Sequence, residues 1–257
     1  MSTSAVQIIY EHPLNERIRT MLRLEHLFSL AMHYRVKQES WDSRIFISTL
    51  IDLLDIFSRG DLKNELIKEL ERSASTLRAL IENPNVDSSR LSTITRAMEH
   101  LIDNLYGMKH QPGHELRTDE FLTAIRQRST IPGGSCDFDL PAYHRWLEQP
   151  WAQREAAQKR WFSQLDPIRQ AIDLQLKMIR NSADPRTIVS DGGSYQQSLD
   201  TSLPFQLLRV SLPAESPYYA EISGSRHRFN IRFLLQQDGR AQKTDENVSF
   251  QLTCCSL

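Results

Sequence analysis

The sequence has few cysteines, no long apolar run and almost no net charge, and each absence argues against a class of protein. Its 257 residues include three cysteines, Cys136 and the adjacent Cys254 and Cys255; this is a poor framework for disulfides or a CxxC metal site, so we expect reduced thiols. No apolar run reaches about 18 residues, and the first ten residues lack the pattern of a signal peptide, so we expect a cytoplasmic protein without direct membrane binding. With 31 Lys and Arg against 32 Asp and Glu, no overall field attracts nucleic acid, and electrostatic recognition is expected to be local.

Sequence signatures of common catalytic and cofactor sites are also missing. The chain has no GxGxxG, GxxxxGK[ST], HExxH or GxSxG segment, so we predict no cofactor, no metal and no enzymatic activity. His110 and His114 have the spacing of two metal ligands on a helix, but the Pro112-Gly113 pair between them disfavours that helix. Cys136 precedes His144 by a short segment, and a thiol beside an imidazole is an alternative, nucleophilic site. We favour the simpler interpretation that Cys136 is a buried structural residue.

Apolar residues recur every three or four positions from Leu14 to about residue 181, which is typical of helices that bury one face. Gly60 is expected to end the second helix, the Asn83-Pro84 pair to end the third, and Asp87 to cap the fourth. The expected helices cover 14–28, 46–57, 62–81, 91–105, 121–125, 141–147, 151–165 and 166–181. Because most of the links between them are short, the helices are expected to pack as antiparallel neighbours in a bundle.

From Pro185 onward the apolar period falls to two, which is typical of half-buried strands. Val6 to Tyr10 is a further short strand that we expect to end in a turn at Glu11-His12-Pro13. An unpaired strand would leave its backbone groups unsatisfied, so this strand is expected to join the C-terminal sheet. The sequence therefore predicts an α+β protein with a helical domain over 14–183 and an antiparallel β-domain, built on one sheet, over 5–12 and 184–257.

The segment from Ser225 to Phe233 contains three arginines and no acidic residue. In a strand, alternation places Phe229, Ile231 and Phe233 on one face and the arginines at 228 and 232 on the other, with their Cα atoms about 13 Å apart. The use of Arg without Lys suits bidentate recognition of carboxylates, which favours an acidic peptide as ligand. Two alternatives remain, a merely solvated outer face and a nucleic-acid binder that uses the same arginines against phosphates.

Several segments are similar to those of the ZapD family of bacterial cell division proteins. The resemblance covers about residues 6–255, with its motifs in the same order, at 10–16 (YEHPLNE), 53–60 (LLDIFSRG), 126–128 (RQR), 131–136 (IPGGSC) and 254–255 (CC). It implies a helical domain that forms a homodimer and a β-domain that binds the C-terminal tail of FtsZ. The function implied by the resemblance is that such a dimer cross-links FtsZ filaments in the cytoplasm at midcell and stabilises the Z ring at the division septum.

The resemblance also implies a tail-binding site. By motif, Arg228 and Arg232 of the β-domain and Arg59 at the end of an early helix match the family's tail-binding arginines, and Arg226 of the same basic segment is added as a candidate. Because Arg59 belongs to the helical domain, the site is expected to lie where the sheet meets the bundle.

A second charged surface, associated in the family with filament bundling, is expected on the helical domain. The matching residues are Arg23 and His144. Glu120 occupies the position where the family has a basic residue near the start of the fifth helix. Arg117 is the candidate that compensates for this departure.

Overall fold

The computed structural model describes residues 6–81 and 87–257, which form nine helices and eight strands. They divide into two compact units, one over Leu22–Gln175 and the other combining the residues up to Met21 with Leu176–Leu257. The unit boundaries fall inside helices α1 (Glu16–Arg35) and α9 (Asp166–Arg180), not at the predicted residues 14 and 183. The predicted domain limits stay a prediction. Two of the predicted features, residue 5 as the start of the β-domain and the helix end at Asn83-Pro84, lie outside the described residues.

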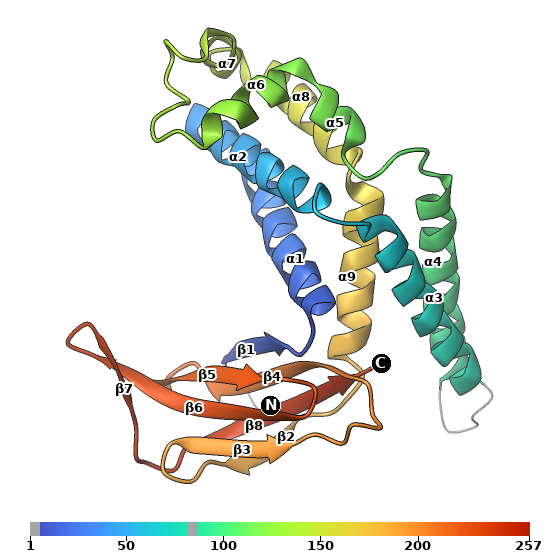
Figure 1. The fold of residues 1–257 in the computed structure, drawn as a ribbon, viewed down its shortest axis with the longest axis vertical. Coiled ribbons are helices and arrows are strands. Elements are labelled where there is room, and N and C mark those ends of the chain that lie inside the picture. Colours follow the sequence, from blue (N-terminus) through green and yellow to red (C-terminus); the bar gives the residue numbers. More distant parts are fainter. Residues whose placement is uncertain (1–5, 82–86) are drawn as a thin grey trace. The chain divides into compact units, whose positions relative to one another are not determined.

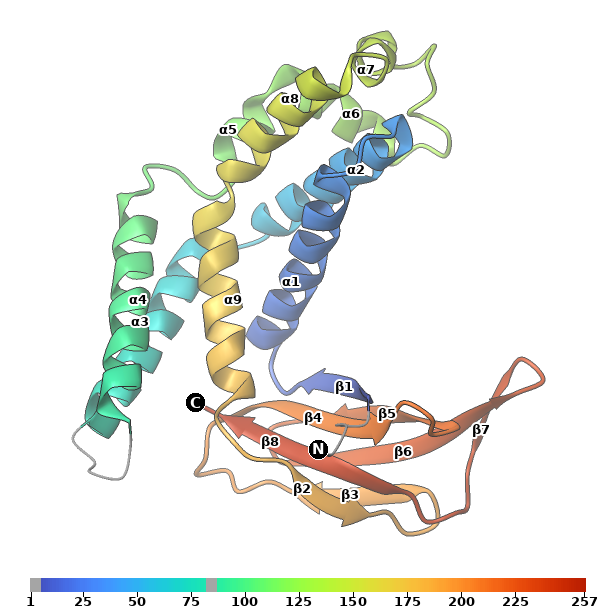
Figure 2. The same ribbon diagram turned by 180° about the vertical axis from the view of Figure 1, so that it is seen from behind.

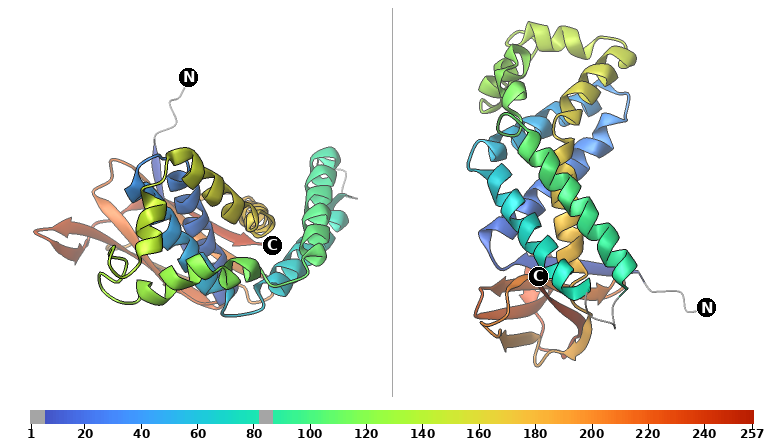
Figure 3. Two further views of the ribbon diagram at one scale, coloured as in Figure 1. Left: turned by 90° about the horizontal axis from the view of Figure 1, so that it is seen from above. Right: turned by 90° about the vertical axis from the view of Figure 1, so that its right-hand side faces the viewer.

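The helical unit contains most of α1, the greater part of α9 and seven complete helices between them. These are α2 (Ser40–Phe57), α3 (Leu62–Ile81), α4 (Ser88–Gly107), α5 (His114–Thr118), α6 (Glu120–Ser129), α7 (Pro141–Leu147) and α8 (Trp151–Ser163). Helices α3 and α4 lie side by side in every view (Figure 1, Figure 2, Figure 3). No helix in the described ranges combines the length and apolar character needed to cross a membrane.

Two helix ends differ from the sequence prediction and one agrees with it. Asp87 caps α4 as expected, because its side chain accepts a hydrogen bond from the Arg90 amide at 3.0 Å. Gly60 does not cap α2: the cap residue is Ser58 in a right-handed conformation, and its amide bonds back to Leu54 and Ile56. A short helix, α5, begins at His114, between the expected helices over 91–105 and 121–125, where the sequence predicts no helix.

The β unit consists of two antiparallel sheets that share one core, instead of the single sheet predicted. One sheet has the order β1-β4-β8-β2 and the other β3-β6-β5, with β7 also paired to β6. The strands are β1 (Gln7–Pro13), β2 (Arg186–Val189), β3 (Ser194–Ser198), β4 (Phe205–Pro213), β5 (Tyr218–Gly224), β6 (Arg228–Gln237), β7 (Arg240–Lys243) and β8 (Ser249–Ser256). Leu208, Val210, Phe250 and Leu252 of the first sheet and Phe229, Ile231 and Phe233 of the second belong to one buried cluster. Full burial of each side chain of this size contributes about 1.5–3 kcal/mol to the free energy of folding.

The N-terminal strand joins the C-terminal strands as predicted, because β1 pairs with β4 along its whole length. It does not turn at Glu11, however, but continues as a strand to Pro13, which pairs with Leu207. A proline is tolerated there because β1 is an edge strand, so no second neighbour requires its missing amide. The Leu14 amide then donates to the carbonyl of Gln206 at 2.9 Å.

Two glycines, Gly192 and Gly193, form the turn between β2 and β3 and differ in the space around them. Gly193 has φ +66° and a Cβ there would overlap the carbonyl oxygen of Thr244, whereas Gly192, at φ +49°, has 3.9 Å of room to the nearest atom, the Asp245 oxygen. We expect Gly193→Ala to lower the free energy of unfolding by about 3 kcal/mol, from backbone strain plus overlap, and Gly192→Ala by about 1 kcal/mol from strain alone. Urea denaturation followed by circular dichroism measures both, and equal losses would contradict the tight contact.

Candidate functional site

Strand β6 has the alternation predicted from its sequence. Phe229, Ile231 and Phe233 are buried, while Arg228 and Arg232 are exposed on the opposite face. We use the name arginine face for this outer side of β3, β6 and β5. It comprises Arg228, Asn230 and Arg232 of β6, with Ser194, Gln196 and Ser198 of β3 and Glu221 and Ser223 of β5 as their cross-strand neighbours.

The register of the arginine face is fixed by the core behind it. A slip of one residue would carry both arginines into the apolar core and expose the aromatic side chains. The two phenylalanines also make ring contacts there: Phe229 lies 6.3 Å from Tyr195, and Phe233 lies 4.9 Å from Phe250 of the other sheet. The arginines are therefore held outward by the apolar face of their own strand.

The arginines differ in the partners that the structure gives them. Arg232 forms an ion pair with Glu221, its cross-strand neighbour, and both side chains are about half exposed. Within the described ranges, the guanidinium of Arg228 has no ion-pair or hydrogen-bond partner, and that of Arg226 donates to Nε2 of His227 at 3.0 Å. Exposed ion pairs contribute little, about 0–1 kcal/mol. Arg228 is thus the arginine of this face best placed to meet an external carboxylate, and Arg232 can exchange its partner at small cost.

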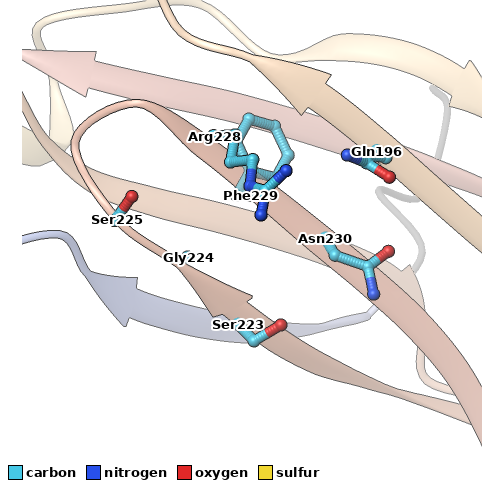
Figure 4. Close-up of a pocket in the computed structure, with 7 residues that line it drawn as sticks. All are labelled: Gln196, Ser223, Gly224, Ser225, Arg228, Phe229 and Asn230. Carbon is cyan, nitrogen blue, oxygen red and sulfur yellow. The ribbon is translucent and has the colours of Figure 1, made fainter.

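Two hollows flank the turn that links β5 to β6. The first, of about 410 Å³, lies on the arginine face and is lined by Arg228 together with polar groups of all three strands, among them Gln196, Ser223 and Asn230 (Figure 4). The second, of about 720 Å³, combines Arg226 and His227 with apolar side chains of Leu14, Leu203 and Phe205. Arginine beside polar and apolar walls suits a ligand that carries both carboxylates and apolar groups.

His12 of β1 lies close to the backbone of Gly224, at the start of the same turn. Burial lowers the pKa of His12, the backbone of Gly224 acts in the opposite direction, and the positive charge of Arg19 lowers the pKa further. The imidazole is therefore expected to be neutral at pH 7, and it adds no positive charge next to the arginine face.

Arg59 lies in the helical unit, directly after the residue that caps α2. Its side chain is exposed, and its amide donates to the carbonyl of Ile56 at 3.1 Å. The expectation that Arg59 completes the site of Arg228 and Arg232 stays a prediction.

The three candidates for the bundling surface are on three different helices of the helical unit. Arg23 is an exposed residue of α1. His144 of α7 has its Nδ1 3.1 Å from a carboxyl oxygen of Asp137. Arg117 of α5 is half-buried and donates to the carbonyl of Pro112 at 3.1 Å; burial, together with the charge of Arg126, lowers its pKa. No contact found in the described ranges brings these three side chains together.

The cysteines do not behave as one class. Cys136 lies in the turn-rich segment between α6 and α7 and is exposed. The prediction that Cys136 is buried is therefore wrong. His144, its proposed imidazole partner, interacts with Asp137. Burial raises the pKa of Cys255 to about 11, so this thiol is protonated at neutral pH and unreactive. Among the described residues, no group of three or more His, Cys, Asp or Glu side chains is placed to bind a metal ion.

Sequence reasoning missed three residues of the β5–β6 pair that bear on the site. Glu221 neutralises Arg232, and Tyr219 and Leu234 form the next cross-strand pair on the same outer side. A sequence signal for the neighbouring hairpin was present, because Asp238-Gly239 is a strong two-residue turn motif and both residues have positive φ, 49° and 76°. The pairing of β5 with β6 had no such signal.

Comparison with known proteins shows the family to which this chain belongs. The model of the ZapD family, described as a cell division protein, matches residues 22–232, which include the whole helical unit and the arginines of β6. The chain belongs to the ZapD family. A protein of Methylococcus capsulatus named cell division protein ZapD is 40% identical over 252 residues, covering 98% of this chain and 99% of the relative. A protein of Ralstonia pickettii with the same name is 38% identical over 253 residues, covering 97% and 100%.

These matches confirm the family predicted from the sequence motifs and extend over both units of the chain. The ZapD name and its description refer to cell division and to no catalysed reaction. The protein is thus a cell division protein of the ZapD family.

Proposed function

We propose that this protein binds the C-terminal tail of FtsZ on the arginine face and, as a homodimer, cross-links FtsZ filaments in the cytoplasm at midcell. The arginine face supports this most directly. It offers two outward arginines about 13 Å apart on a rigid strand, one of them without a partner in the described structure, beside a hollow of about 410 Å³. Planar guanidinium groups bind carboxylates in bidentate pairs, and the tail is a short segment of acidic and apolar residues.

A single site of this kind is expected to bind its target weakly or moderately. The tail is flexible, so ordering it against the sheet has an entropic cost that offsets part of the contact energy. A dimer carries two such sites, and a filament displays many tails, so the second contact forms at a high effective concentration. Dimerisation is therefore as important for filament cross-linking as the site itself.

The helical unit has three roles in this proposal. It forms the dimer, and it supplies Arg59 as an additional contact to the tail. It also provides a second contact with the filament, for which the candidates are Arg23, His144 and Arg117. All but Arg117 have exposed side chains, and Arg117 is half-buried.

A direct binding experiment tests the tail-binding step. A fluorescent FtsZ tail peptide is titrated with the protein, alongside a scrambled peptide of the same composition and a single-stranded oligonucleotide. Specific recognition predicts tighter binding of the native order than of the scrambled one. Equal binding of both peptides, or preferential binding of the oligonucleotide with a steep salt dependence, would instead favour the phosphate-binding alternative.

The cross-linking step is tested by mixing subunits. Wild-type protein is allowed to exchange subunits with an excess of an Arg228→Glu, Arg232→Glu double variant, and filament bundling is followed by light scattering. A dimer with one defective site binds a filament but joins no second one, so bundling is expected to fall with the square of the wild-type fraction. As a control, the Arg240→Glu variant is added in place of the double variant. Its substitution lies outside the arginine face, so bundling should be unchanged. A decrease only in proportion to the wild-type fraction would contradict the bivalent mechanism.

A further inference from the structure

The outer side of β6 changes character beyond Arg232. The next residue with the same orientation is Leu234, and its cross-strand neighbour on β5 is Tyr219. Both side chains are partly exposed, and neither belongs to the cluster that fills the space between the two sheets. The arginine face therefore continues into an apolar pair that contributes nothing to the buried core.

This apolar pair has a cationic neighbour on its other side. Lys243 of β7 is the register partner of Leu234 on the strand opposite β5, and its side chain is exposed. Along the outer side of these strands the charged residues are thus Arg228, Arg232 and Lys243, against Glu221 alone. A positively charged surface with one apolar patch is complementary to a segment that combines acidic residues with an apolar side chain.

We infer that Tyr219 and Leu234 form the anchor site for an apolar side chain of the bound tail, while Arg228 pairs with an acidic residue of the same tail. This inference rests on the proposed tail binding and specifies its geometry. Leu234 lies six positions after Arg228, a distance of about 20 Å along a strand. An extended peptide of the same rise would present its acidic and apolar anchors six residues apart, or nearly so.

The pair is suited to this role because both side chains are only partly buried. A Tyr and a Leu opposite one another stabilise the sheet through their mutual contact, and a bound apolar side chain would remove further surface of both from water. The aromatic ring also supplies contact area with few rotatable bonds, so little entropy is lost on binding. The anchor makes binding specific for the order of residues in the peptide, because it fixes which end of the peptide lies at Arg228. The arginines alone do not provide this specificity.

The test uses Leu234→Ser and Tyr219→Ser, each in the full-length protein, with Gln236→Ser as a matched control two positions further along the same outer side. We expect each of the first two to weaken binding of the FtsZ tail peptide about five- to tenfold, the effect of losing much of one apolar contact, and the control to bind as wild type. Thermal unfolding of every variant verifies that the sheet is intact. Wild-type affinity in both serine variants, with Arg228→Glu impaired, would overturn this inference and leave the proposed function standing.

A second arm assigns the contact to one residue of the peptide. Each apolar residue of the tail is replaced by alanine, and the loss is measured with wild type and with Leu234→Ser. The residue that occupies the anchor should lose affinity with wild type but little further affinity with the variant, as contacting residues are non-additive. Full additivity at every position would overturn the anchor. If the wild-type protein binds no tail peptide at all, the proposed function itself fails, which is a different result from either outcome above.

Discussion

Replacing Arg228 with glutamate is expected to weaken binding of the FtsZ tail peptide by at least about 30-fold. A charge-assisted hydrogen bond contributes about 1.5–3 kcal/mol, and the new carboxylate would also repel the acidic ligand. A loss of about 2 kcal/mol corresponds to about 30-fold in the dissociation constant. Fluorescence anisotropy at about 0.1 M salt measures this, because screening at higher salt would reduce the difference.

The two arginines of β6 are expected to differ in their effect. Arg232 already shares its charge with Glu221, so Arg232→Glu should weaken binding less than Arg228→Glu. Arg240→Glu is the matched control, since Arg240 pairs with Gln237 at the far end of β6 and is exposed. If all three charge reversals weaken binding equally, recognition depends on overall charge and the arginine face has no special role.

Replacing Glu11 with glutamine is expected to lower the free energy of unfolding by about 3 kcal/mol. Glu11 of β1 accepts hydrogen bonds from Arg180 of α9 at 2.8 and 2.7 Å and from Arg209 of β4 at 2.9 Å. The exposed fractions of these side chains are 18% for Glu11 and 23% for each arginine. Glutamine keeps the volume but removes the carboxylate that these two largely buried guanidinium groups share. Urea denaturation at pH 7 measures the change.

The same carboxylate makes part of the stability depend on pH. Burial acts to raise the pKa of Glu11, but the hydrogen bonds and charges of Arg180 and Arg209 outweigh it and lower the pKa from its ordinary 4.5. A group with a lowered folded-state pKa stabilises the protein above its unfolded pKa, and this contribution is lost as the pH falls through the folded value. The difference between wild type and Glu11→Gln should therefore be constant near neutrality and shrink progressively below about pH 4.5.

Glu221→Gln is the control for this stability prediction. It removes the carboxylate of an ion pair in the same unit whose side chains are 52% and 53% exposed, so its cost should be about 0–1 kcal/mol. A loss as large as that of Glu11→Gln would mean that burial does not determine the strength of these pairs. A Glu11→Gln variant as stable as wild type would contradict the structural role of the cluster.

Much of the fold was predictable because its signals are local. The change of apolar period near residue 185 separated helices from strands, and the alternation within β6 correctly sorted Phe229, Ile231 and Phe233 from the arginines. The pairing of β1 followed from backbone hydrogen bonding, which no isolated strand satisfies. The wrong predictions concern features that depend on contacts between distant segments. These are the number of sheets, the strand in place of a turn at Glu11, and the exposure of Cys136.

The sequence by itself determined the family, the α+β class and the face of β6 on which the arginines lie, since a twofold period is imposed by the geometry of any strand. Only the tertiary structure decided which charges meet. Arg232 is paired with Glu221 and Arg228 is not, and Glu11 binds arginines 169 and 198 residues away. The register and packing of the whole β unit bring these distant residues together, and they do so in a way that leaves few buried polar groups unsatisfied. A local sequence pattern does not contain this information.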